Sequence, residues 1–150
     1  MPIISDYMSG EHKACDEALA RAEESAANGD WAAAEAGFKT YKRAMHRHMA
    51  MEEEVLFGAF EEETGMSGAG PTEVMRHEHA QIRGLIDEMK TAVDAKDKNE
   101  YLGLAETLLV LMQQHNLKEE GMLYQMMDQV LASQAGELIA RCNAFEVAST

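Results

Sequence analysis

The stretch His-Met-Ala-Met-Glu at residues 48–52 decides the fold, because it returns as His-Asn-Leu-Lys-Glu at residues 115–119, 67 positions later. In each copy the histidine and the glutamate belong to a stripe of otherwise apolar residues spaced three and four apart, which is expected to continue to Val55 and to Met122. Such a stripe is the buried face of an α-helix. A spacing of four puts the two polar side chains one turn apart on that face. Each copy therefore predicts a helix that carries an imidazole and a carboxylate into the core.

The repeat also includes the helix that precedes each stretch. The same shift aligns residues 11–12 with residues 78–79, which read Glu-His in both places. One helical hairpin thus occurs twice, at about residues 6–63 and 71–132, with polar or glycine-containing turns between the helices. We predict one all-α domain over residues 1–150, an up-down-up-down four-helix bundle with an internal duplication of the helical hairpin and a short C-terminal helix. The expected helices span residues 6–28, 30–62, 71–96, 97–132 and 134–145.

The turns place the histidines at one level of the bundle. The midpoint between His12 and His48 is residue 30, and the midpoint between His79 and His115 is residue 97; both fall in predicted turns. Residues equally far from the tip of an antiparallel hairpin lie side by side, here about 25 Å from the tip. The midpoint between residues 48 and 79 falls just before the glycine-rich loop. Either the helix frays after Gly58 or the loop folds back.

Six polar residues are therefore expected to meet in the core. An unpaired buried carboxylate is costly, and the sequence offers few buried cations to offset it. A pair of divalent metal ions would satisfy all six side chains at once. Imidazole and carboxylate without thiolate suit iron or manganese, with zinc as a further option. His46 and His77 lie about 200° around their helices from the neighbouring histidines and are expected to face solvent. The predicted metal ligands are His12, His48, Glu52, His79, His115 and Glu119.

The composition excludes several other classes of protein. Asp and Glu number 27 against 13 Lys and Arg, and the formal charge of −14 repels nucleic acid and anionic membranes. The sequence contains no signal-peptide pattern and no apolar run of about 18 residues, so no membrane span is expected. Cys15 and Cys142 form no Cys-x-x-Cys motif and are expected to be reduced thiols rather than a disulfide. These features indicate a soluble cytoplasmic protein.

At these residues the chain resembles the hemerythrin-like family, also called the hemerythrin HHE cation-binding domain. The matching pieces, at residues 11–12, 48–57, 78–83 and 115–124, follow the family order. The resemblance implies a non-haem di-iron centre with an oxo or hydroxo group between the irons. It also implies that each hairpin supplies two histidines to one iron, and that two glutamates bridge both irons. By this resemblance His12 and His48 would bind one iron, and His79 and His115 the other. Glu52 and Glu119 would bridge the two irons.

One departure from the family pattern bears on function. Oxygen-carrying hemerythrins have a fifth histidine one turn beyond the first on the third helix, and an aspartate as one bridging carboxylate. Here that turn holds Arg83, and both bridging candidates are glutamates. More positions would then be open to water, O2, NO or peroxide. Arg83 could pair with Asp16, its match across the repeat, as a group near the site, or it could neutralise a nearby glutamate.

Three functions are consistent with this sequence. The leading hypothesis is a metal-binding protein whose di-iron centre binds or senses O2, NO or available iron; as a sensor it would signal through a partner protein. The second is a di-iron enzyme that reduces O2 or peroxide, or donates iron to damaged iron centres. The third is a structural zinc site or a mononuclear metal site that only holds the bundle together. The sequence leaves open whether the protein is an enzyme.

Overall fold

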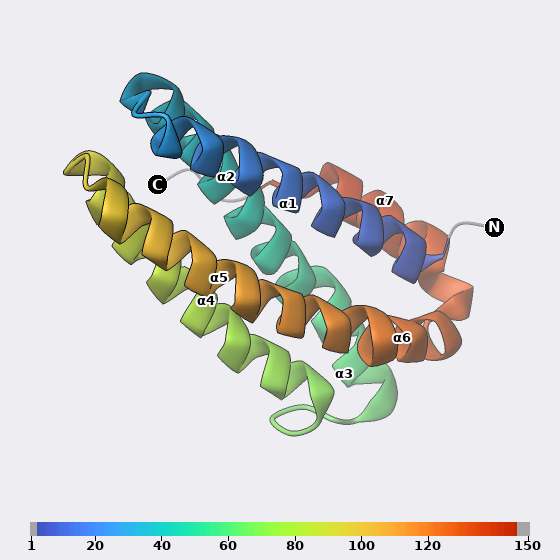
Figure 1. The fold of residues 1–150 in the computed structure, drawn as a ribbon. Helices are drawn as coiled ribbons and strands as arrows, with labels where there is room; N and C mark the ends of the chain where they lie inside the picture. The colour runs from blue at the N-terminus through green and yellow to red at the C-terminus, as the bar shows by residue number, and fades with distance from the viewer. Residues whose placement is uncertain (1–2, 147–150) are drawn as a thin grey trace.

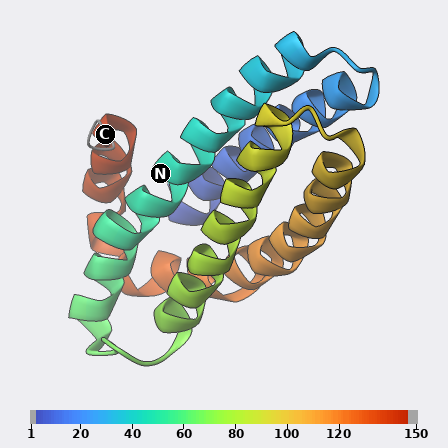
Figure 2. The same cartoon turned by 90° about the vertical axis from the view of Figure 1, so that its left-hand side faces the viewer.

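The computed structural model describes residues 3–146, and the two ends of the expected domain, residues 1–2 and 147–150, lie outside that range. Within it the chain is all-α and contains no strand. Two antiparallel hairpins pack into an elongated bundle (Figures 1 and 2). The elements are α1 (Ile4–Ala27), α2 (Trp31–Met51), the π-helical segment η1 (Glu52–Phe57), α3 (Gly58–Thr64), α4 (Pro71–Asp94), α5 (Lys98–Lys118), the π-helical segment η2 (Glu119–Leu123), α6 (Tyr124–Val130), the 3-10 turn η3 (Ala132–Gln134) and α7 (Ala135–Ala144).

The predicted bundle is confirmed, including the short C-terminal helix. The first hairpin joins α1 to α2, and the second joins α4 to α5, as Figure 2 shows most clearly. The helix α7 packs beside α1 and η1, outside the four-helix arrangement (Figure 1). No helix among residues 3–146 has the length and apolar character needed to cross a membrane.

Both hairpin turns use the same local geometry, as the internal repeat requires. Gly29 and Lys96 occupy equivalent positions with φ angles of 76° and 53°, in the left-handed region that favours glycine. The next residues, Asp30 and Asp97, each cap the following helix by accepting a hydrogen bond from the backbone N–H three residues later. These caps start α2 and α5 at matching positions, and so set the histidines of each hairpin at one level.

The connection between the hairpins folds back, and the alternative of a helix that frays after Gly58 is wrong. The helix continues through α3 to Thr64, and Gly65 ends it in the left-handed conformation with a φ of 74°. The Thr72 hydroxyl then donates to Glu61 at 2.7 Å, so the start of α4 lies beside α3. The loop of residues 65–70 therefore absorbs the unequal lengths on its two sides.

The π-helical segments η1 and η2 were not expected, and one residue predicted to be in the core, in η2, is exposed. Each begins at a glutamate of the repeated stretch, so that the second long helix and the fourth are both interrupted there. In η2 the backbone N–H of Tyr124 donates to the carbonyl of Glu119, five residues earlier, as in a π-turn. This turn is wider than that of an α-helix, whose backbone hydrogen bonds span four residues. Met122, predicted to be buried, is 47% exposed, whereas its counterpart Val55, at the same position of η1, is buried.

The core consists of two apolar clusters separated by the polar residues. One cluster fills the end of the bundle near the hairpin turns, and it includes Phe38, Tyr41 and Leu108. The other fills the end near the central loop and includes Phe60, Met75 and Met127. His12 lies in sequence between members of the two clusters, as do the other three predicted histidines. The polar residues therefore form a layer between the two clusters. The apolar packing on both sides offsets part of the free-energy cost of burying this layer.

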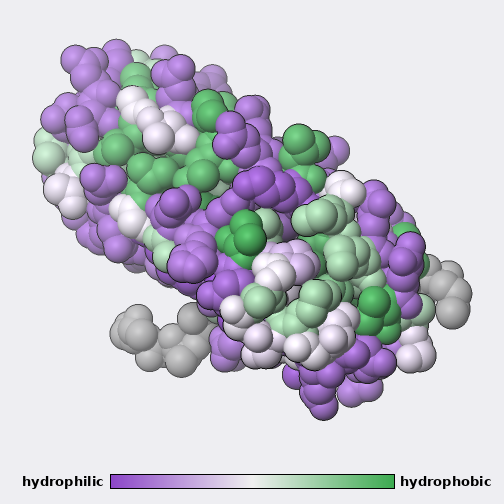
Figure 3. Space-filling view, turned by 90° about the horizontal axis from the view of Figure 1, so that it is seen from below, coloured by the Kyte–Doolittle hydropathy of each residue, from purple (hydrophilic) through white to green (hydrophobic). Residues whose placement is uncertain are grey.

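The surface is mostly hydrophilic, with apolar side chains gathered in places. Figure 3 shows these as green areas interrupted by purple on the face seen from below. Helix α5 is apolar over much of its circumference and exposes Val110 at 50% and Leu117 at 73%. The remaining exposed large apolar residues are Ile3, Val74, Leu109 and Met122.

Candidate metal centre

The six predicted ligands come together in one buried layer. They lie on α1, on α2 and the first residue of η1, on α4, and on α5 and the first residue of η2, so all four long helices contribute. None is more than 4% exposed, a burial that is rare for histidine and glutamate without partners. The six residues are His12, His48, Glu52, His79, His115 and Glu119.

Each glutamate lies between histidines of both hairpins. The Oε1 atom of Glu52 is 3.1 Å from Nε2 of His48, one turn earlier on the same helix, and 3.3 Å from Nε2 of His79 on α4. The Oε1 atom of Glu119 is 3.2 Å from Nε2 of His115 and 3.0 Å from Nε2 of His12 on α1. Both carboxylates therefore span the interface between the two halves of the molecule.

Most of the ring nitrogens that face the centre make no hydrogen bond there. Among the described residues, the Nε2 atoms of His48, His79 and His115 have no hydrogen-bond partner, and neither do Oε1 of Glu52 and Oε2 of Glu119. Buried polar atoms left in this state cost free energy, and native proteins avoid them. Five such atoms converging on one spot fit a set of metal ligands, because a cation satisfies lone pairs that no donor in the chain reaches.

The outer nitrogen of His79 is held by a chain of charged groups. Its Nδ1 lies 2.6 Å from Oε2 of Glu53, and Nη1 of Arg83 donates to the same oxygen at 2.9 Å. Arg83 therefore neutralises a glutamate beside the site, and no hydrogen bond or ion pair joins it to Asp16 among residues 3–146. Such an acceptor fixes the tautomer that leaves Nε2 free to bind a metal.

Two other histidines also have carboxylates at their outer nitrogens. Nδ1 of His115 lies 2.8 Å from Glu78, which also contacts the ammonium of Lys118. Nδ1 of His12 lies 3.2 Å from Glu120. His48 differs, because its Nδ1 is buried without a hydrogen-bond partner in the described chain.

These outer carboxylates were part of the sequence motif, but no role was predicted for them. Glu53 and Glu120 directly follow the two glutamates of the centre and correspond across the repeat. Glu78 directly precedes His79, and its counterpart Glu11 contacts Arg47 at 3.1 Å instead of a histidine. Adjacent charged residues are usually solvated surface groups, so spacing alone did not distinguish them.

Tyr124 is a further polar residue of the centre that the sequence analysis missed. Its hydroxyl is fully buried, donates to Oε2 of Glu52 at 2.6 Å, and lies 2.8 Å from Oε1 of Glu119. The Tyr124 hydroxyl oxygen is also 3.1 Å from Nε2 of His12. The hydroxyl reaches the centre because η2 brings the residue five positions after Glu119 to the same face. The repeat offered one signal, since Phe57 occupies the equivalent position and stacks on His79.

The carboxylates and imidazoles shift one another's protonation. Burial lowers the pKa of His12, but the adjacent Glu119 and Glu52 outweigh it and raise the pKa to about 9. The pKa of His79 likewise rises to about 9, because the carboxylates around it outweigh its burial. Burial raises the pKa of Glu52, yet His48 and the other contacts bring it well below its ordinary value. The carboxylates therefore favour positive charge in this layer, which protons on the imidazoles or a bound cation can supply.

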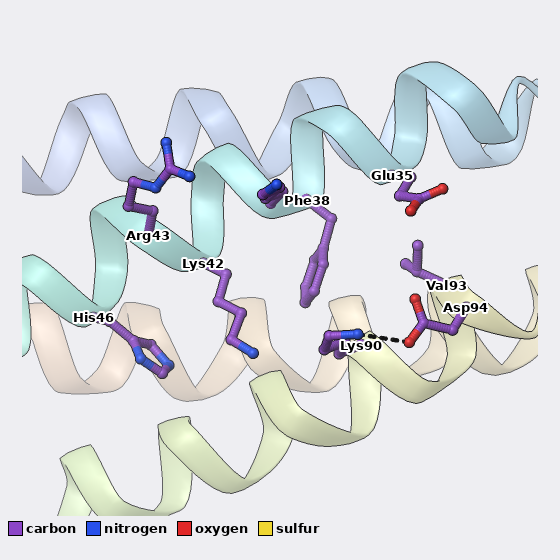
Figure 4. Close-up of a pocket in the computed structure, with 9 residues that line it drawn as sticks. Glu35, Phe38, Lys42, Arg43, His46, Lys90, Val93 and Asp94 are labelled. Atoms are coloured by element: carbon purple, nitrogen blue, oxygen red, sulfur yellow. Dashed lines mark hydrogen bonds and ion pairs between the residues drawn. The ribbon is translucent and has the colours of Figure 1, made fainter. Parts of the chain in front are cut away.

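A surface cavity of about 480 Å³ lies elsewhere, between α2 and α4, and none of the six residues lines it (Figure 4). His46 lines this surface cavity, away from the six residues, but it is half-buried and so less exposed than expected; His77 is 79% exposed, as expected. Cys15 and Cys142 are both buried and free, which confirms the expected thiols.

Comparison with known proteins agrees with this geometry. No curated protein and no solved structure matches the chain significantly. The sequence profile of the hemerythrin HHE cation-binding domain matches residues 3–127, which include the six buried histidines and glutamates and most of the bundle. The buried cluster is thus a candidate cation-binding site. The chain belongs to the hemerythrin family of HHE cation-binding domains.

Proposed function

We propose that the buried layer binds two metal ions, preferably iron, and that the protein binds or senses O2, NO or available iron there. The ligands would be His12, His48, Glu52, His79, His115 and Glu119. Their donor set contains imidazole and carboxylate and no thiolate, which suits iron or manganese better than a structural zinc site. A structural zinc site would need only four ligands, whereas six buried donors are present here.

One observation carries the proposal of two ions rather than one. Each of the two glutamates lies within 3.3 Å of a histidine from both hairpins, and five inner donor atoms of the described chain have no hydrogen-bond partner. A carboxylate has two oxygens, so Glu52 and Glu119 can each contact two ions at once. Facing carboxylates of this kind hold two ions in other helical bundles.

The surroundings of the layer determine what could bind with the metal. All six side chains are almost completely buried, and apolar clusters cover both sides, so only a small molecule would reach the centre. When bound, two irons would supply redox chemistry and affinity for O2, NO or peroxide. The chain itself would orient the imidazoles through the outer carboxylates, and Tyr124 would offer a hydroxyl hydrogen bond beside the ions.

Removing one bridging carboxylate tests the proposed ligands. We expect Glu52→Ala or Glu119→Ala to lose at least one of the two ions, because each is proposed to contact both. Metal content after reconstitution with Fe(II) measures this loss. Glu54→Ala is the matched control, since this exposed glutamate lies two positions from Glu52 and should leave the metal content unchanged. Full retention of two ions in Glu52→Ala and in Glu119→Ala would show that these residues do not bridge.

Rapid mixing of the reduced, iron-loaded protein with O2 separates a binding protein from an enzyme. Reversible formation of a complex would support binding or sensing. Rapid irreversible oxidation, or turnover of added peroxide, would instead place the protein among di-iron enzymes that reduce O2 or peroxide. Loss of iron to an apo-protein acceptor under the same conditions would indicate iron donation.

A further inference from the structure

The two ends of the candidate metal centre are built differently, although the internal repeat gives them the same residues. Four donor atoms lie within 4.8 Å of one another around His79 and His115, where both Glu52 and Glu119 take part. Around His12 and His48 three donor atoms do so, with Glu119 as the glutamate among them, and Glu52 reaches this half through Oε1, which lies 3.1 Å from Nε2 of His48. We refer to these as the His79/His115 half and the His12/His48 half.

The outer contacts of the His79/His115 half are short and held by cations. Both outer nitrogens lie near carboxylates, at 2.6 Å for His79 with Glu53 and 2.8 Å for His115 with Glu78. Arg83 forms an ion pair with Glu53, and Lys118 forms an ion pair with Glu78. Both imidazoles are therefore fixed in the tautomer and orientation that present Nε2 to the centre.

The outer contacts of the His12/His48 half are weaker. His12 has its carboxylate at 3.2 Å, on Glu120, which is 41% exposed and makes no ion pair with a lysine or arginine of the described chain. His48 has no partner at its outer nitrogen. The residue that the repeat would supply to it is Glu11, but Arg47 pairs with that carboxylate at 3.1 Å.

The same arginine also anchors the C-terminal part of the chain. Arg47 donates to the backbone carbonyls of Cys142, at 2.7 Å, and Phe145, at 3.1 Å. Its counterpart across the repeat is Gln114, which carries no charge and leaves Glu78 free for His115. The packing of α7 thus gives a structural reason why one copy of the repeat keeps its outer carboxylate and the other does not.

These differences have a direct consequence for affinity. Loss of an outer hydrogen bond to a ligating histidine typically weakens metal binding about 10-fold to 100-fold. In the His79/His115 half both histidines have short outer hydrogen bonds, whereas the His12/His48 half has one long outer contact and one histidine with no outer partner in the described chain. We propose that the two ions bind with unequal affinity and in a fixed order, first to the His79/His115 half and then to the His12/His48 half. The second ion is then the exchangeable one. This inference rests on the proposed two-metal function.

Titration of the metal-free, full-length protein with Co(II) tests the order, with visible absorption and calorimetry as readouts. We expect two binding steps whose affinities differ by at least about tenfold. Glu53→Gln and Glu120→Gln are matched variants, because the two residues are equivalent across the repeat and contact His79 and His12 respectively. Glu53→Gln should weaken the tighter step about 10-fold to 100-fold, whereas Glu120→Gln should weaken only the second step.

A second pair of variants identifies the halves without relying on the outer carboxylates. His48→Ala should keep one tightly bound Co(II) ion, and His115→Ala should keep only weak binding. Circular dichroism of each metal-free variant checks that it is folded, and release to a chelator from the unchanged protein should be biphasic. Two ions that bind in a single step, or a tighter step weakened by Glu120→Gln, would overturn the proposed order. Saturation of the unchanged protein at one ion would instead contradict the two-metal function itself.

Discussion

Tyr124 is the residue whose hydroxyl connects the two glutamates of the candidate centre. It lies 2.6 Å from Glu52 and 2.8 Å from Glu119, and it is fully buried. Such contacts offset part of the cost of burying a carboxylate, since a hydrogen bond to a charged group is worth about 1.5–3 kcal/mol. Burial and the two carboxylates raise the pKa of the phenol well above its ordinary value, so the hydroxyl keeps its proton and acts as a donor.

We predict that Tyr124→Phe lowers the free energy of unfolding of the metal-free protein by about 1–3 kcal/mol, because it leaves buried carboxylate oxygens without their donor. Urea denaturation monitored by circular dichroism measures the change. Tyr101→Phe is the control, since the Tyr101 hydroxyl is buried without a hydrogen-bond partner in the described chain and its loss should be nearly neutral. Equal effects of the two substitutions would contradict the role assigned to Tyr124.

Among the elements, the two hairpin turns show how the repeat preserves geometry more closely than sequence. Gly29 and Lys96 occupy the same left-handed position, but only glycine adopts it without a steric penalty. The φ of 53° at Lys96 is the one positive value for a non-glycine residue in the described chain. The second turn is therefore strained where the first is relaxed.

This strain predicts opposite effects of two exchanges. Lys96→Gly should stabilise the protein by about 0.5–1 kcal/mol. Removing the steric cost of the left-handed conformation outweighs the larger backbone entropy that glycine loses on folding. Gly29→Lys should destabilise it by a similar amount or more. Thermal denaturation of the two variants beside the unchanged protein measures both. A lower melting temperature for Lys96→Gly would refute the explanation, because the side chain itself would then be stabilising.

Sequence reasoning predicted the regular helices correctly and failed where the helices become irregular. Periodicity and the 67-residue repeat were sufficient to predict the four long helices and the common level of the histidines. They also predicted the burial of all six proposed ligands. Periodicity assumes a constant helical turn, and η1 and η2 break that assumption. For this reason Tyr124 was overlooked. The π-helical turn does not explain why Met122 is exposed, because Val55 is buried at the same position of η1. The route of residues 65–70 depends on contacts such as that between Thr72 and Glu61, which no local pattern encodes.

At the scale of the whole molecule, the bundle consists of two apolar clusters with a layer of histidines and glutamates between them. The apolar clusters stabilise the fold, while the layer opposes it unless its charges are neutralised. Approximate twofold symmetry brings one copy of the histidine and glutamate pattern from each hairpin into this layer. The position of α7, held by Arg47, breaks the symmetry on one side.

The metal content of the protein decides whether this layer holds two metal ions. We predict about two iron ions per chain after anaerobic reconstitution with Fe(II) and removal of excess metal, as in other helical bundles with paired carboxylates. Metal analysis by mass spectrometry, together with a protein concentration from amino-acid analysis, gives the ratio. A ratio of one, with zinc retained in preference to iron, would contradict the two-metal centre and indicate a structural or mononuclear site.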